Sequence, residues 1–142
     1  MWLISLCAGA ILSAATPSVL TVEPAALVAS LKLPARSADR PVVLHIGPDS
    51  NFKDKHVPGA IHAGLGAAPD GQAKLRATAR RLDRNRPVVL YCGCCAWSIC
   101  PNFRPPVAVL KKMGFKDVRV LHLPDDFFID WVRKGHPVAK GG

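Results

Sequence analysis

The chain has 142 residues, of which 49% are hydrophobic and 20% are charged. This length accommodates one ordinary domain with its own core and excludes a second full domain. The composition excludes a disordered or fibrous protein. The formal net charge of +9 favours anionic partners, although charge alone does not separate nucleic acid, an anionic membrane surface and a small anion. Because no aromatic and basic residues alternate along a strand pattern, we expect no nucleic-acid partner.

The N-terminus has an uncharged apolar stretch over residues 2–15 that ends in small side chains. We predict a signal peptide at residues 1–15 and therefore a periplasmic or secreted protein. The stretch is shorter than the roughly 20 apolar residues that a bilayer requires, so we expect no stable membrane span. It lacks a basic residue before the apolar run, which leaves two alternatives: an upstream start, or a first strand or helix of the domain. The bulky Leu6 before Cys7 argues against a lipoprotein cleavage site.

The next segments predict a helix and two buried strands. Residues 21–24, with Pro24 in the first turn, predict the start of a helix over residues 25–32. Residues 41–46 and 87–92 are short and almost continuously apolar, which is typical of strands buried on both faces of a parallel sheet.

Amphipathic patterns follow each strand. Apolar residues that recur on one helical face predict helices over residues 72–83, 105–113 and 125–134, and a further strand is predicted over residues 118–121. The alternation of strands and helices predicts an α/β fold with a central, mainly parallel sheet that is flanked by helices.

Four of the five cysteines fall in one short segment, at Cys92, Cys94, Cys95 and Cys100. Cys92 ends the second apolar run, and ligands of parallel sheets bind beyond the carboxyl ends of strands. The following loop can direct backbone N–H groups at an anion, which also lowers the pKa of a thiol. We therefore predict that Cys92 is a nucleophile.

The chain resembles the rhodanese-like domain, the single-domain sulfurtransferase family, over residues 21–138. Residues 55–61 resemble the family's Gly-His-Ile-Pro-Gly-Ala segment, and residues 86–92 resemble the strand that delivers its catalytic cysteine. Residues 110–118 resemble the helix end and the turn into the last strand. Trp131 with residues 135–138 resembles the closing Trp and Gly-x-Pro-Val pattern.

This resemblance implies a three-layer rhodanese-like fold and a catalytic Cys92. The thiol would take a sulfane sulfur from a small anionic donor such as thiosulfate, become a persulfide, and pass the sulfur to a thiol or other thiophilic acceptor. The activity would need no cofactor and no metal. The residues expected to bind the donor are Gly93, Cys94, Cys95, Ala96, Trp97, Ser98 and Arg104.

The sequence departs from the family at three places. The loop between Cys92 and Gly114 is longer than usual by about five residues. Ser98 stands where the related phosphatases carry an Arg, which disfavours a phosphatase. The usual Asp-x-Arg after the first buried strand is replaced by residues 45–47, and the usual Gly-Gly before the last helix is replaced by residues 126–127.

The extra loop cysteines leave three interpretations open. Cys94, Cys95 and Cys100 can form a loop disulfide, act as redox partners that resolve a persulfide on Cys92, or hold a soft metal. The corresponding alternative functions are a thiol–disulfide redox or sulfur-carrier module and a non-catalytic, metal-holding binding domain.

Two histidines also carry predictions. His45, at the end of a predicted strand, can hydrogen-bond the loop or join a metal site, whereas His56 is expected to stabilise a turn through hydrogen bonds. Trp131 is expected to be a core residue.

Overall fold

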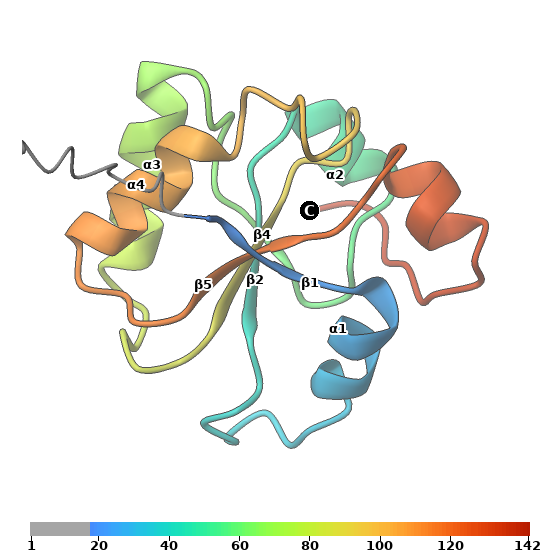
Figure 1. Ribbon diagram of the computed structural model, residues 1–142, viewed down its shortest axis with the longest axis horizontal. Helices are drawn as coiled ribbons and strands as arrows, with labels where there is room; N and C mark the ends of the chain where they lie inside the picture. The colour runs from blue at the N-terminus through green and yellow to red at the C-terminus, as the bar shows by residue number, and fades with distance from the viewer. Residues whose placement is uncertain (1–17) are drawn as a thin grey trace, which may run out of the picture.

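The computed structural model describes residues 18–142 (Figure 1). The predicted signal peptide at residues 1–15 lies outside the described residues. A five-stranded sheet forms the centre, in the order β1-β5-β4-β2-β3, and all of its strand pairs are parallel. Its strands are β1 (Leu20–Val22), β2 (Val42–His45), β3 (Ile61–His62), β4 (Val88–Tyr91) and β5 (Val118–Leu121). The predicted α/β fold with a parallel sheet is confirmed.

Helices cover both faces of the sheet, as Figure 1 shows. They are α1 (Pro24–Leu31), α2 (Asp49–Asp54), α3 (Pro69–Ala79), α4 (Arg104–Lys112) and the π-helical segment η1 (Phe128–Val132). None of the helices described between residues 18 and 142 combines the length and the apolar character that crossing a membrane requires.

Alternate side chains of the strands belong to two hydrophobic clusters, one on each face of the sheet. Leu44 and Leu90 belong to the cluster that also contains buried residues of α3 and α4. Val43 and Val89, on the opposite face, pack in the cluster with Leu27 of α1 and with Trp131, which is fully buried. The prediction that Trp131 is a core residue is confirmed. Burial on both faces explains why these strands are almost continuously apolar.

The N-terminal and C-terminal elements differ from the sequence expectation. Leu20–Val22 form strand β1 beside β5, rather than only a lead into the first helix. The predicted helix over residues 125–134 is reduced to η1, because the segment before it is bent: the Asp130 carboxylate accepts bonds from the N–H groups of Asp125 and Asp126.

The helix predicted over residues 72–83 starts and ends earlier, at Pro69 and Ala79. Proline is favoured in the first turn of a helix because its missing N–H has no intrahelical partner there. Leu82 therefore lies after the helix, where it still packs against the core as a half-buried side chain.

Candidate active site

Cys92 lies directly after β4, the strand that pairs with both β2 and β5. Its side chain is only 6% exposed. The chain then turns at Gly93, whose φ of +78° is favoured only for glycine. A Cβ at Gly93 would also lie 2.8 Å from the Cβ of Phe127. The sharp turn therefore leaves Cys92 at the carboxyl end of a central strand, where parallel sheets bind their ligands.

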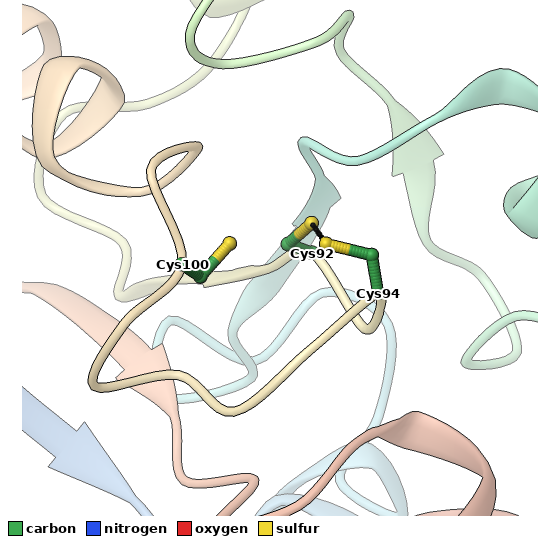
Figure 2. A group of neighbouring side chains, drawn as sticks. All are labelled: Cys92, Cys94 and Cys100. Atoms are coloured by element: carbon green, nitrogen blue, oxygen red, sulfur yellow. Dashed lines mark hydrogen bonds between the residues drawn. The ribbon is translucent and has the colours of Figure 1, made fainter.

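Three thiols converge at this point (Figure 2). The sulfur atoms of Cys92, Cys94 and Cys100 all lie within 4.8 Å of one another, with Cys94 and Cys100 on opposite sides of Cys92. The Sγ atoms of Cys92 and Cys94 are 3.0 Å apart, and those of Cys94 and Cys95 are 3.1 Å apart. All four loop cysteines are free thiols in the structure. The loop disulfide stays a prediction.

The surrounding donors stabilise a thiolate on Cys92. The Cys100 thiol is the strongest of them, and together with the thiol and backbone N–H of Cys94 and the amide of Asn102 it lowers the pKa of Cys92 to about 6 against the opposing effect of burial. Burial and the neighbouring Cys92 raise the pKa of Cys94 to about 12. The hydrogen bond to Cys92, followed by burial, raises the pKa of Cys100. One negative charge therefore resides on Cys92, and its two neighbours keep their protons.

Asn102 is a site residue that the sequence analysis did not single out. Its Nδ2 atom donates to Cys92 Sγ at 3.3 Å, and its Oδ1 atom accepts a bond from the N–H of Ala67 at 3.0 Å. The side chain is buried. It thus connects the end of the loop to the segment before α3. The only signal in the sequence is an amide residue close to the predicted start of the helix at residue 105.

His45 interacts with the backbone of Cys92, at the start of the cysteine loop. The sequence analysis predicted a hydrogen bond between His45 and this loop. Burial, and then the neighbouring His62, lower the pKa of His45 to about 4, while a hydrogen bond to the backbone of Cys92 opposes this shift. The Nδ1 atoms of His45 and His62 are 3.0 Å apart. His45 is therefore neutral near pH 7, and its ring interacts with the backbone of Cys92 on one side and with His62 on the other.

Gly47 explains one departure from the family pattern. A Cβ at this position would lie 2.5 Å from the backbone oxygen of Cys92 and 2.9 Å from its Sγ. Residue 47 is where the family usually carries an Arg, and the position has no space for a side chain here. The altered segment at residues 45–47 is therefore matched to the position of Cys92.

A cavity of about 140 Å³ opens beside Cys92. It contains one cationic side chain, Lys55, whose Nζ lies 6.0 Å from the ring centroid of Phe128. The other lining residues are His45, Asn51, Asp54, Tyr91, Cys92, Gly93, Phe127 and Val132. The space combines a neutral histidine, three aromatic side chains and one lysine and one aspartate side chain next to a thiolate, and the lysine can bind the charged end of a small anion.

Most of the predicted donor-binding residues lie outside this cavity. Only Gly93 among them lines it. Arg104 is exposed, with its guanidinium 5.9 Å from the ring of Phe103. Trp97 donates its backbone N–H to the carbonyl of Leu123, and it packs against the core together with Cys95. The partly buried Ala96 and the exposed Ser98 complete the loop.

His56 has the structural role predicted for it. Its Nδ1 lies 2.7 Å from the carbonyl oxygen of Phe52, and its backbone pairs with Ala139. These bonds secure the turn after α2, the helix that supplies Asn51 and Asp54 to the cavity.

Solved structures share this fold. The BH2092 protein of Bacillus halodurans is 19% identical, with a TM-score of 0.64 over 85% of this chain and 77% of its own. A protein from Anabaena sp. is 19% identical, with a TM-score of 0.61 over 84% of this chain and 92% of its own. The thiosulfate sulfurtransferase of Pseudomonas aeruginosa is 26% identical, with a TM-score of 0.63. It aligns over 88% of this chain but only 20% of its own length.

The family assignment rests on the sequence as well as on the fold. No curated protein matches the chain closely by sequence. The family model of the rhodanese-like domain matches residues 29–123, which is more than half of the chain. The matched range contains β2 to β5 and the whole cysteine loop, and four of the five parallel strands therefore lie inside it. The chain belongs to the rhodanese-like domain family.

Proposed function

We propose that this protein is a sulfurtransferase that moves a sulfane sulfur from an anionic donor such as thiosulfate to a thiophilic acceptor through a persulfide on Cys92. The observation that carries the proposal is the Cys92 thiol, which follows β4, has its pKa lowered to about 6, and lines a cavity with a lysine in its wall. A thiol with this pKa is mostly thiolate at pH 7, which is the nucleophilic form.

The first step forms one sulfur–sulfur bond and breaks another. The Cys92 thiolate attacks the outer sulfur of thiosulfate, and sulfite leaves with the electron pair of the broken bond. The product is an anionic persulfide on Cys92. The acceptor then attacks the terminal sulfur and regenerates the thiolate; with cyanide as acceptor the product is thiocyanate. The donors that stabilise the thiolate of Cys92 can also stabilise the negative persulfide.

Lys55 supports the choice of an anionic donor. It is the cation among the lining residues of the cavity, where Asp54 carries the opposite charge and the neutral His45 adds none. An ammonium group attracts the sulfonate oxygens while the sulfane sulfur faces Cys92. Arg104 was the sequence-based candidate for this role, but it does not line the cavity.

Thiocyanate formation from thiosulfate and cyanide tests the proposal. Cys92→Ser is expected to abolish turnover, with thermal unfolding measured to show that the variant is folded. Turnover at the wild-type rate in Cys92→Ser would refute the proposal. Lys55→Ala is expected to raise KM for thiosulfate by about tenfold, the effect of losing roughly 1.4 kcal/mol of binding. Lys111→Ala, an exposed lysine on α4, is the matched control.

A second candidate function is a metal-holding domain, because the sulfur atoms of Cys92, Cys94 and Cys100 lie within 4.8 Å of one another. Thiolates bind soft metals. However, two thiolates on one tetrahedral zinc ion lie about 3.8 Å apart, given a Zn–S distance of about 2.3 Å. Cys92 and Cys94 are 3.0 Å apart, so a shared zinc ion would require their sulfur atoms to separate by about 0.8 Å. Elemental analysis of protein purified without chelator tests the candidate: a stoichiometric metal that blocks alkylation of Cys92 would support it.

Export is also part of the proposal. It rests on the uncharged apolar stretch at residues 2–15. N-terminal sequencing of the protein recovered from cells tests it: a mature start near residue 16 is expected, and an intact Met1 would refute it.

A further inference from the structure

We propose that Cys94 resolves the Cys92 persulfide: it attacks Cys92 Sγ, releases the transferred sulfur as sulfide and closes a Cys92–Cys94 disulfide, which an external dithiol then reopens. The inference rests on the proposed persulfide and adds to it a second catalytic thiol, a product and a partner class. The site would therefore reduce a sulfane sulfur to sulfide at the expense of a dithiol.

The geometry favours Cys94. Its Sγ is 3.0 Å from Cys92 Sγ, and a disulfide bond is about 2.05 Å long, so closure needs a movement of about 1 Å. Cys94 is exposed and follows Gly93, which has a φ of +78°. Figure 2 shows the two sulfur atoms facing each other.

The step balances without an added oxidant. The persulfide carries its negative charge on the terminal sulfur, and Cys94 carries a proton. The Cys94 proton moves to the terminal sulfur, and the resulting Cys94 thiolate attacks Cys92 Sγ. The bond between Cys92 and the terminal sulfur breaks, and hydrosulfide leaves with the electron pair. The sulfane sulfur is reduced, and the two cysteines are oxidised.

Burial distinguishes Cys94 from Cys100, the other thiol beside Cys92. Cys100 is 3% exposed, whereas Cys94 is exposed on the loop. The disulfide must be reopened by a thiolate of the dithiol, and an attack on an exposed Cys94 sulfur expels Cys92. Exchange favours the leaving thiol with the lower pKa, which here is Cys92. Cys100 remains as a hydrogen-bond donor to Cys92.

A single-turnover experiment tests the inference. Fully reduced protein, freed of external thiol, is mixed anaerobically with thiosulfate, and sulfide is trapped with monobromobimane. The wild-type protein is expected to release about one sulfide per chain, to lose two free thiols, and to lose about 2 Da in a disulfide mapped to Cys92 and Cys94. Cys94→Ser is expected to release no sulfide and to accumulate a persulfide of about 32 Da on Cys92. Cys95→Ser is expected to release sulfide.

Three results would overturn the inference. A stable persulfide without sulfide release in the wild-type protein would refute the resolving step while leaving the proposed sulfurtransferase function intact. A sulfide burst that persists in Cys94→Ser, or a disulfide mapped to Cys92 and Cys100, would refute the assignment to Cys94. If no variant forms a persulfide or releases sulfide, the proposed function itself fails. Cys94→Ala repeats the test if Cys94→Ser proves unstable in thermal unfolding.

Discussion

Cys100→Ala is expected to raise the pKa of Cys92, because the Cys100 thiol is the strongest donor to the Cys92 thiolate. The wild-type pKa is lowered from 9.0 to about 6. A hydrogen bond to a charged group is worth about 1.5–3 kcal/mol, which corresponds to roughly 1–2 pKa units. The variant should therefore titrate between about 7 and 8, and the thiolate fraction at pH 7 should fall from about nine tenths to half or less.

Alkylation of Cys92 by iodoacetamide at a series of pH values, read by peptide mass spectrometry, measures this shift. The rate should rise with pH and level off above the pKa, because only the thiolate reacts. Asn102→Ala should give a smaller rise, since its amide is the weakest of the donors to Cys92. Cys95→Ala is the matched control, since Cys95 is not among those donors. A wild-type midpoint near 9, or an unchanged midpoint in Cys100→Ala, would refute the reasoning.

Three further substitutions test the scaffold of the site by chemical denaturation. Gly47→Ala places a Cβ 2.5 Å from the Cys92 carbonyl oxygen and should cost about 1–3 kcal/mol of unfolding free energy, with reduced sulfur transfer; wild-type values for both would contradict this steric argument. Tyr91→Phe leaves the buried N–H of Val57 without the phenolic oxygen that it meets at 3.0 Å, and should cost about 1–3 kcal/mol; a loss below about 0.5 kcal/mol would mean that this bond contributes little. Trp131→Ala empties a fully buried position and should cost about 3–5 kcal/mol, and a loss under about 1 kcal/mol would show that the site is not a packed core position.

The three longest strands could be predicted because their signal is local. Strands β2, β4 and β5 are short apolar runs, and each is buried on both faces by the helices that flank the sheet. The weaker strands could not be predicted in this way. β1 and β3 contain three and two residues, and their ends include the exposed Leu20 and Ile61. They become strands through hydrogen bonds to distant segments, which no local pattern records.

The place of the nucleophile was also readable in the sequence, because a cysteine that ends a buried parallel strand lies at the edge where such sheets bind ligands. The groups that surround the nucleophile could not be predicted from the sequence. Lys55 reaches the cavity from the segment after α2, although Arg104 is closer to the loop in sequence. The role of Gly47 is visible only from its distance to Cys92.

The sequence by itself determined the order of β2, α3, β4, α4 and β5 along the chain, the family resemblance and the cysteine that follows β4, since apolar periodicity and motifs are properties of neighbouring residues. Only the tertiary structure decided which groups meet that cysteine. Asn102 joins Cys92 to Ala67, and His45 interacts with the backbone of Cys92. The 3.0 Å between the sulfur atoms of Cys92 and Cys94 depends on the turn at Gly93. These contacts arise when parallel pairing brings the ends of separate strands together. They lower the pKa of Cys92 and raise the pKa values of Cys94 and Cys100.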